Sequence, residues 1–463
     1  MSSSAKPSQT LATDSQEVLD EGSQAYRLGG FHPVYIGDIY HDRYEVLSKI
    51  GYGGYSTVWL VRDGKATKGG SSEFRALKVL SAECYGAEKD IYEREILRHL
   101  RYGNPMRRGY EFICHLEDDF EHKGPNGTHV CLVFQLCGES MLMYGARFED
   151  LMIPTEVMRR ITTQLLLALD YAHKFGASNI FVKMKTYSRI ENGYLAQDTV
   201  QQNRSEGQYT VIPSRPLSRY SFQPDDRVDE IDIVLGDWGF SCWTDYHLCE
   251  VIQPVTLRAP EVLLGAGWGP AADVWSVGAT VLEMYRDVRM FIGLTAPDGP
   301  YKLGQHLAEI EHLLGPFPKA LLDKGDPDRV GRIFDKDGKV KDVDESDANL
   351  DKWSPDTVGR TFGKKRKFKY VDEWDADHNL MSEWYTPGLP QDVKAKFVAF
   401  LNAAMAINPA DRPKPAGLLM DPWGMIRGRP ESDAAWASER FRAGERSELG
   451  LSLPFHPRRD EQT

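Results

Sequence analysis

Hydrophobic and polar residues alternate in short runs along the first third of the chain, which is the pattern of β-strands that are buried on one face. Turns that contain Gly or Asn bound these runs, which lie at 43–50, 57–63, 74–80 and 129–136. Before the last run, residues 87–100 carry Ile91, Ile96, Leu97 and Leu100, which can form one apolar stripe on a helix. The pattern therefore predicts a small sheet accompanied by one helix.

After residue 140 the hydrophobic spacing becomes helical. Residues 155–174 have apolar side chains at helical spacing, and residues 273–285 are apolar nearly all round, as in a helix buried in a core. Residues 186–230 and 319–380 are polar, weakly periodic and rich in Gly, Pro and Asp, which predicts surface insertions. Strands that precede the helices, and do not alternate with them, predict an α+β protein of two lobes and exclude an ordinary alternating α/β fold.

Composition narrows the class of protein. The net charge of −12 argues against a general nucleic-acid coat and favours a basic peptide partner, so we expect no direct nucleic-acid binding. Six scattered cysteines without C-x-x-C spacing argue against a zinc site or a disulfide framework. Residues 1–29 are polar and read as a disordered tail without the apolar core of a signal peptide. No run of apolar residues is long enough to span a membrane.

The segment IGYGGYSTVWL (50–60) places Gly51, Gly53 and Gly54 in a turn between two predicted strands. Glycine lets backbone N–H groups approach phosphate oxygens closely, although a hairpin turn with no ligand has the same composition. The position of the turn favours a phosphate loop, because a strand with Lys78 and then a helix with Glu95 follow it. This order is typical of protein kinases.

Lys78 needs an opposite charge to hold its ammonium over the α- and β-phosphates of ATP. We predict that Glu95 supplies this charge, which makes Lys78 and Glu95 the predicted catalytic residues. Glu93 lies two positions away on a different face of the helix and is the weaker candidate. The alternatives are a solvated strand lysine and a charged helix face, and the order of the motifs disfavours both.

Two further motifs follow in kinase order. Asp237-Trp238-Gly239 supplies a carboxylate that can hold Mg²⁺ against the β- and γ-phosphates, with Trp238 where kinases usually have Phe. Ala259-Pro260-Glu261 matches the end of a kinase activation segment. Either motif alone could arise by chance, but both occur in order ahead of the predicted buried helix.

These motifs lead to a family resemblance. GGFHPVYIGDIYHDRYEVLSKIGYGGYSTVWLVRD (29–63) resembles the N-terminal signature of the SR-protein kinases, which phosphorylate Arg-Ser repeats in splicing factors. HVCLVFQLCG and APEVLLGAGWGPAADVWS resemble the same group, and the likeness runs from about residue 29 to 424. It implies an ATP- and Mg²⁺-dependent serine/threonine kinase with a bilobal, protein-kinase-like fold. The parts would be an N-lobe at 30–140, a C-lobe at 141–428 that carries both insertions, and a C-terminal tail at 429–463.

The resemblance also assigns roles to residues. Phe134 would be the gatekeeper, Asp273 would brace the catalytic loop, and Arg412 would pair with Glu261. Asn179 and Asp237 would hold Mg²⁺. Val58 and Ala76 would cover the adenine ring of ATP. The positions that would contact ATP are Ile50, Gly51, Tyr52, Gly53, Gly54, Ser56, Val58, Ala76, Lys78, Phe134, Gln135 and Cys137.

The catalytic loop departs from the family. In SR-protein kinases this loop resembles HTDIKPDN, and its Asp accepts the proton of the substrate hydroxyl. Here SNIFV (178–182) fits the end of the loop, but Lys174 stands where the Asp belongs, and no Asp or Glu occurs from Tyr171 to Ile190. We interpret this as a deletion of roughly seven or eight residues. A gap-free alignment would instead put Phe181 and Thr186 at the Asp and Asn positions.

Two explanations of the deletion remain open. The chain is either a pseudokinase that binds nucleotide or protein without transferring phosphate, or an active kinase with a lesion in this sequence, and we favour the lesion because the other ligands are retained. The expected partners are basic Arg-Ser-rich proteins such as splicing factors. We expect cytoplasmic and nuclear localisation, and the basic run GKKRKFK (363–369) is a candidate import signal or a solvated surface.

Overall fold

The computed structural model divides into two compact units. One unit comprises Met1–Arg94, His115–Glu139 and Met184–Gln223, and the other comprises Glu95–Cys114, Ser140–Lys183 and Pro224–Thr463. The structure describes residues 20–70, 73–85, 91–141, 153–172, 179–184, 186–197, 209–217, 220, 231–239, 241, 243, 247, 249–286, 291, 293, 300–341 and 389–424, together with the backbone of 362–366 and 384–386.

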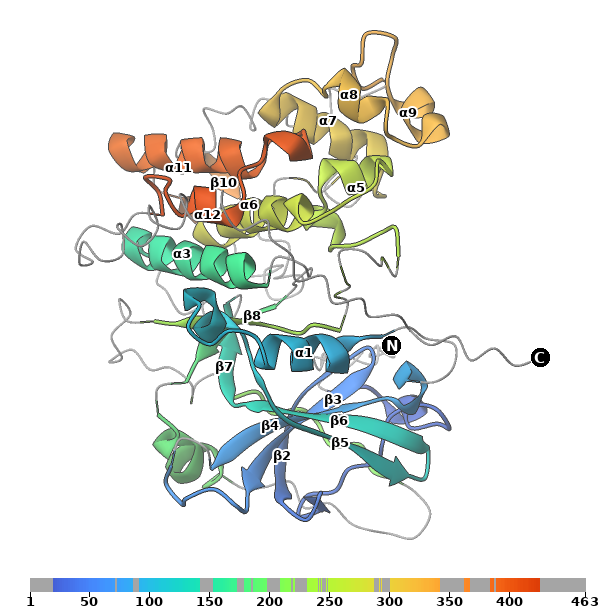
Figure 1. Cartoon of the computed structure of the whole chain (residues 1–463), viewed down its shortest axis with the longest axis vertical. Helices are drawn as coiled ribbons and strands as arrows, with labels where there is room; N and C mark the ends of the chain where they lie inside the picture. The colour runs from blue at the N-terminus through green and yellow to red at the C-terminus, as the bar shows by residue number, and fades with distance from the viewer. Residues whose placement is uncertain are drawn as a thin grey trace, which may run out of the picture. The chain divides into compact units, whose positions relative to one another are not determined.

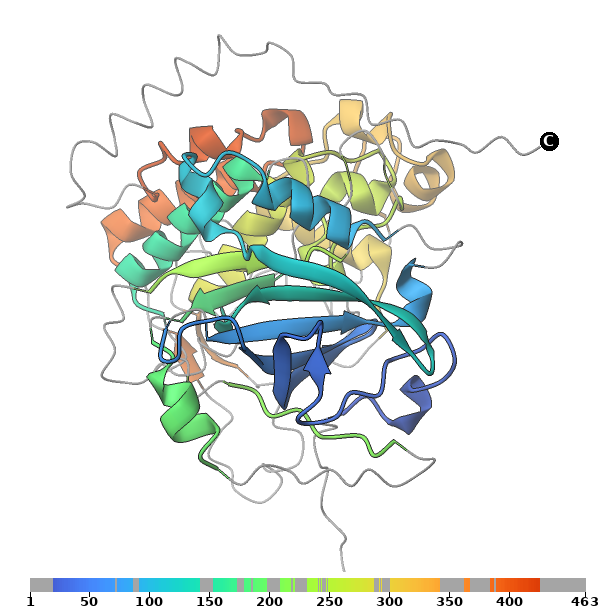
Figure 2. The same cartoon turned by 60° about the horizontal axis from the view of Figure 1, so that its bottom comes forward.

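The first unit is built on an antiparallel sheet of six strands in the order β1-β2-β3-β4-β6-β5 (Figures 1 and 2). The predicted strand runs all lie in it. The strands are β1 (Ile39–Tyr40), β2 (Tyr44–Gly53), β3 (Ser56–Asp63), β4 (Phe74–Leu80), β5 (Leu116–Gly124) and β6 (Gly127–Gln135). Hairpins join β2 to β3 and β5 to β6, so most neighbours in the sheet are also neighbours in sequence.

The two faces of this sheet bury two separate apolar clusters. Along β3, Trp59 and Val61 point into one cluster and Leu60 into the other, because successive side chains of a strand alternate between faces. The first cluster also contains Val46, Leu77 and other residues of the sheet. The second cluster is completed by side chains from outside the sheet.

Those side chains come from the segment that follows residue 184. Ile190, Tyr194 and Leu217 are buried in the cluster with Leu60, and Ile212 is buried in the other cluster. This placement differs from the predicted surface insertion of the C-lobe at 186–230. The segment has too little periodicity to reveal its contacts, because its apolar residues fit a surface that another part of the chain provides.

Helices dominate the second unit (Figure 1). Helix α1 (Glu93–Arg101) spans the boundary between the units, a π-helix at Ile190–Tyr194 belongs to the first unit, and the α-helices named next belong to the second unit. They are α3 (Thr155–Tyr171), α5 (Pro260–Leu264), α6 (Ala271–Arg286), α7 (Leu303–Leu314), α8 (Lys319–Leu322), α9 (Pro327–Ile333), α11 (Gln391–Ala404) and α12 (Pro415–Leu418). Short 3-10 turns lie at Ser23–Ala25, Ala82–Tyr85, Arg108–Phe112, Val255–Leu257 and Pro409–Asp411.

An aromatic cluster joins the helices of the second unit. Tyr285 of α6 lies 5.1 Å from Phe397 of α11, and Phe397 lies 4.6 Å from Trp423, measured between ring centroids. The indole N–H of Trp423 donates a 3.3 Å hydrogen bond to Thr162 in α3. The predicted burial of 273–285 is confirmed, since Trp275, Val281 and Tyr285 are all inaccessible.

The remaining strands are short. β7 (Cys137–Ser140) follows β6, β8 (Asn179–Lys183) pairs antiparallel with β9 (Ile233–Gly236), and β10 (Phe362–Arg366) pairs with β11 (Trp384–Thr386). Of the predicted insertion at 319–380, the described part contains α8, α9 and β10. Both predicted tails lie largely outside the described residues. Within the described part of the chain, no helix is long and apolar enough to cross a membrane.

Candidate active site

The glycine turn lies where β2 passes into β3. Gly51 is paired with Val58, and Gly53 with Ser56, so Gly54 and Tyr55 form the tip of the hairpin. A Cβ atom added at Gly51 or Gly54 would meet nothing within 4 Å among the surrounding protein atoms. Gly51 and Gly54 therefore border open space on the side where a Cβ atom would stand.

Lys78 lies one strand away from the turn. It is the partner of Val58 in the register of β3 and β4, which places it on the strand beside the glycine turn. Its ammonium nitrogen lies 2.7 Å from a carboxylate oxygen of Glu93, the first residue of α1. The Glu93 side chain is 2% exposed and the Lys78 side chain 14% exposed, so water screens this ion pair weakly.

The predicted pairing of Lys78 with Glu95 is wrong. Glu93 precedes Ile96, Leu97 and Leu100 by three, four and seven positions and therefore shares the buried stripe of α1. Glu95 stands at the same spacing from Arg98 and His99, both of which are exposed. The stripe is visible in the sequence, and extending it one turn back would have selected Glu93.

The other residues predicted to contact ATP lie on β2, β4 and β6 and directly after β6. Ala76 is paired with Phe134 across β4 and β6, and Ile50 and Ala76 both pack against the cluster that contains Leu60. After β6, the Cys137 thiol lies 3.7 Å from the carbonyl oxygen of Gln135. Phe134, Gln135 and Cys137 are all partly exposed, so they can contact a ligand.

The predicted metal ligands belong to the second unit. Asn179 begins β8, and its Cα partner in the antiparallel register is Gly236, the residue before Asp237. Asp237 has a φ of 55°, an uncommon left-handed conformation for a residue other than glycine. The neighbouring Trp238 is fully buried, as expected of a large apolar anchor. Asp237 follows β9 directly, and carboxylate oxygens are ligands that Mg²⁺ prefers.

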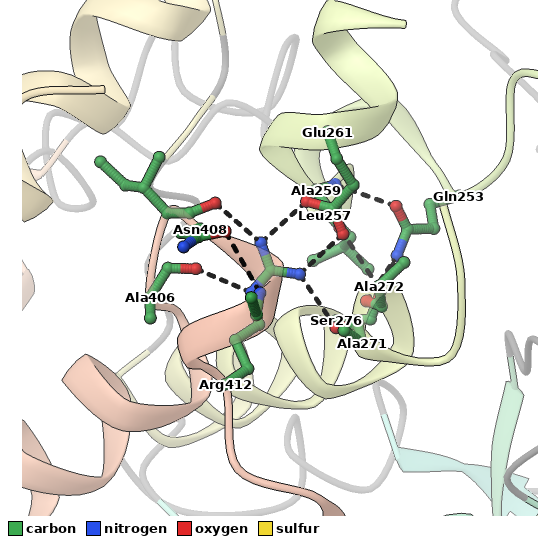
Figure 3. A network of polar contacts seen from close by, with 12 residues as sticks. Gln253, Leu257, Ala259, Glu261, Ala271, Ala272, Ser276, Ala406, Asn408 and Arg412 are labelled. Atoms are coloured by element: carbon green, nitrogen blue, oxygen red, sulfur yellow. Dashed lines mark hydrogen bonds and ion pairs between the residues drawn. The ribbon is translucent and has the colours of Figure 1, made fainter. Parts of the chain in front are cut away.

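The predicted pair of Glu261 and Arg412 is confirmed (Figure 3). Two guanidinium nitrogens of Arg412 donate to the two carboxylate oxygens of Glu261 at 2.7 and 2.8 Å, and both side chains are essentially inaccessible. The guanidinium also donates to the carbonyl oxygens of Ala406, Ala271 and Ile407. These bonds satisfy the buried charge and tie the Ala-Pro-Glu motif to the start of α6 and to the turn before α12.

A residue that the sequence analysis missed reinforces this region. Gln253 has a φ of 68°, and its side-chain amide donates to the Ala272 carbonyl and the Ser276 hydroxyl (Figure 3). Its amide oxygen accepts from the N–H of Ala259 at 2.9 Å. Gln253 thereby holds the segment before the Ala-Pro-Glu motif against α6. Its left-handed backbone has no signature in the sequence, since glutamine carries no preference for that conformation.

Comparison with known proteins places the chain in a family, although no family model matches it. A serine/threonine protein kinase of Aspergillus fumigatus is 30% identical over 343 residues, which cover 72% of this chain and 82% of that protein. The serine/threonine-protein kinase SRPK of Physarum polycephalum is 29% identical over 70% of this chain and 78% of that protein. SRSF protein kinase 3 of Homo sapiens is 24% identical over 72% of this chain and 82% of its own length. The chain belongs to the SR-protein kinase family.

The solved kinase domain of PF14_0431 supports the fold assignment for this SR-protein kinase. It matches with a TM-score of 0.57 and 19% identity over 85% of this chain and 98% of that chain. The predicted α+β, bilobal protein-kinase fold is thereby confirmed. By family, the chain is a serine/threonine protein kinase.

The deletion that the sequence predicts in the catalytic loop falls on residues 173–178, which lie outside the described residues, as does the side chain of Asn179. Asp273, which the family resemblance assigns to bracing the catalytic loop, is described and lies in the first turn of α6. Burial raises the pKa of its carboxyl to about 8, well above its usual 3.8, so the group is largely protonated at neutral pH.

Proposed function

We propose that this SR-protein kinase binds ATP with Mg²⁺ and transfers the γ-phosphate to serine in basic, Arg-Ser-rich proteins such as splicing factors. The observation that carries the proposal is the 2.7 Å ion pair between Lys78 and Glu93, because a kinase needs this pair to place the α- and β-phosphates. The relatives named SRPK and SRSF protein kinase support the substrate class. The net charge of −12 suits a basic substrate.

Several retained residues support the proposed cofactor. Open space beside Gly51 and Gly54 can receive phosphate oxygens, and Lys78 stands on the strand next to the turn. Asn179 and Asp237 would hold the metal, which neutralises negative charge on the phosphates when it is bound. Val58 and Ala76 would contact the adenine ring.

One observation favours a second function. No Asp or Glu lies between Tyr171 and Ile190, so the chain lacks the carboxylate that orients the substrate hydroxyl. If this carboxylate is truly absent, the protein is a pseudokinase that uses the same residues to bind nucleotide or a protein partner. We favour the active kinase because the phosphate and metal ligands are retained, and selection for phosphate transfer would explain why.

Restoring the loop separates the two functions. Inserting HTDIKP ahead of Ser178 would place an Asp five positions before the Asn of SNIFV, as in the family signature. We expect phosphate transfer to an Arg-Ser peptide to rise by at least about 10²-fold, the usual contribution of a positioned base. The matched control is insertion of HTNIKP, which restores the length without the carboxylate. Equal and negligible transfer by both variants, with normal nucleotide binding, would favour the pseudokinase.

We also propose that the protein occurs in both the cytoplasm and the nucleus. The basic run at 363–369 supports this proposal as a candidate import signal. Replacing its lysines and arginine by glutamine should reduce the nuclear fraction of a fluorescent fusion. An unchanged distribution would mean that the run is an ordinary solvated surface.

A further inference from the structure

The insertion after β8 contacts β2 a few residues before the glycine turn. We define the insertion strap as residues 187–197 and 212–217. The hydroxyl of Tyr194 lies 2.9 Å from the Ser48 hydroxyl in β2. The N–H of Arg215 donates to the Lys49 carbonyl at 2.9 Å, and the Lys49 ammonium donates to the Ile212 carbonyl at 3.0 Å. Ser48 and Lys49 immediately precede Ile50 and the glycines. The insertion strap is therefore hydrogen-bonded to β2 next to its turn.

The buried side chain of Lys49 fixes where the insertion strap contacts β2. Its side chain is completely inaccessible, and besides Ile212 it contacts the carboxylate of Glu21 in the segment before β1. A buried ammonium without partners is strongly destabilising, so the contacts with Glu21 and Ile212 draw the N-terminal segment and the insertion strap onto the same strand. Neither contact is needed to form the sheet, because Lys49 has its own partner, Trp59, across β2 and β3.

The two parts of the insertion strap are joined to each other by contacts between Tyr194 and Arg215. The Tyr194 hydroxyl donates to the Arg215 carbonyl at 2.6 Å, and the Arg215 guanidinium donates back to the Tyr194 carbonyl at 2.7 Å. The guanidinium carbon also lies 3.7 Å from the centre of the Tyr194 ring, which is a close cation–π contact. These reciprocal contacts make Tyr194 and Arg215 one rigid piece, although 21 positions separate them.

The insertion strap also packs against the sheet beside Ile50 and Ala76, two positions that are predicted to contact ATP. Ile190, Tyr194 and Leu217 share a buried cluster with Leu60, Phe74 and Leu136, and Ile50 and Ala76 pack against that cluster. The Tyr187 hydroxyl donates to the Leu136 carbonyl at 3.4 Å, one residue beyond β6. A shift of the insertion strap would therefore move both the strand before the glycine turn and the surface beside Ile50 and Ala76.

We propose that the insertion strap is a positioning element for nucleotide binding, in which Tyr194, Arg215 and Lys49 set the position of the glycine turn. The inference rests on the proposed function, because it assumes that the turn receives ATP. Ser48 and Gly51 are about 10 Å apart along an extended strand, so the insertion strap acts through β2 without touching the ligand. Its residues are positioning residues and not catalytic ones.

The test compares two Tyr→Phe variants in the same insertion. Tyr194→Phe keeps the buried ring and removes the bonds to Ser48 and Arg215. Tyr209→Phe is the matched control, because its hydroxyl donates instead to the Val34 carbonyl at 3.0 Å. Two quantities are measured on the full chain: the Kd for a fluorescent ATP analogue with Mg²⁺, and hydrogen exchange at the amides of 50–56 without nucleotide.

We expect Tyr194→Phe to weaken binding by about three- to tenfold, a loss comparable to one or two hydrogen bonds, and to speed exchange in the turn. Tyr209→Phe should change the Kd less than about twofold, even where both variants lower the melting temperature equally. If the two variants bind equally well and exchange equally, the proposal is overturned while ATP binding stands. If the unsubstituted chain binds no nucleotide, then the proposed function fails. Faster exchange in Tyr194→Phe alone would in that case show that the insertion strap controls the turn.

Discussion

The ammonium of Lys78 lies 2.7 Å from the carboxylate of Glu93 and not beside Glu95. The strand supplies the cation and the first turn of α1 supplies the anion, and both are largely removed from water. This geometry holds the Lys78 side chain in one place before any nucleotide arrives. It is the arrangement that phosphate binding requires, since a freely rotating lysine would lose entropy on binding.

The first prediction distinguishes the two glutamates. Glu93→Gln should weaken binding of a fluorescent ATP analogue about tenfold, equivalent to about 1.4 kcal/mol, because Lys78 loses its charged partner. It should also lower the free energy of unfolding by about 1–3 kcal/mol, the usual cost of removing one partner of a hydrogen bond to a charged group. Titration and urea unfolding measure the two effects. Glu95→Gln is the control, and an equal loss of affinity in that variant would contradict the assignment.

The second prediction concerns the buried pair of Arg412 and Glu261. Arg412→Met should lower the free energy of unfolding by about 3–5 kcal/mol, because Glu261 would remain buried and charged without a partner. Arg412→Lys should recover only part of this loss, since an ammonium cannot make the two parallel bonds of a guanidinium. Chemical unfolding monitored by tryptophan fluorescence is the measurement. Lys319→Met, which breaks the exposed pair with Asp323, should leave stability nearly unchanged.

The third prediction follows from Asp273. Burial raises the pKa of its carboxyl from 3.8 to about 8, so between these values the folded protein holds a proton that the unfolded chain releases. The unfolded state binds fewer protons there, and stability must fall as pH rises, by up to about 1.4 kcal/mol per pH unit. Asp273→Asn should flatten this decline in urea unfolding measured between about pH 5 and about pH 8. Asp392→Asn in α11 is the control, and an unchanged slope in Asp273→Asn would mean that a different group causes the decline.

The fourth prediction concerns three histidines in the first unit. His32 lies 4.6 Å from His122 and 4.9 Å from His129 between ring centroids, and the ring of Tyr40 lies 5.9 Å from His32. Burial, followed by repulsion from His129 and His122, lowers the pKa of His32 to about 3. The neutral His32 ring therefore makes its full contribution to the free energy of unfolding above pH 6.5, the pKa of histidine in the unfolded chain. This contribution is lost as the pH falls from 6.5 towards 3.

His32→Gln should reduce this loss, because the substituted side chain cannot gain a proton. Urea unfolding at about pH 7.5 and about pH 5 measures the effect, since the unfolded histidine is protonated only at the lower value. His312→Gln, at an exposed position in α7, is the control. If the two variants show the same dependence on pH, the buried histidines do not limit stability in acid.

Local pattern was sufficient for most of the fold and for the linear motifs. Alternation predicted β2, β3, β4 and β6, and helical spacing predicted α3 and α6, because each of these elements buries one face against a continuous core. The family resemblance implied the pair of Arg412 and Glu261, although 151 positions separate the two residues. Such motifs are readable because their chemistry requires particular residue types at particular spacings.

What the sequence by itself determined was the order of the chemical parts: a glycine turn, a lysine, a helical acid, a metal carboxylate and an absent catalytic aspartate. Only the tertiary structure decided that Glu93 faces Lys78, that Gln253 takes a left-handed backbone, and that the insertion strap packs on the sheet around Ser48 and Lys49. The reason is physical. Residue types and spacings are properties of one segment, whereas the direction of a side chain and the partner of a buried group depend on surfaces that distant segments supply.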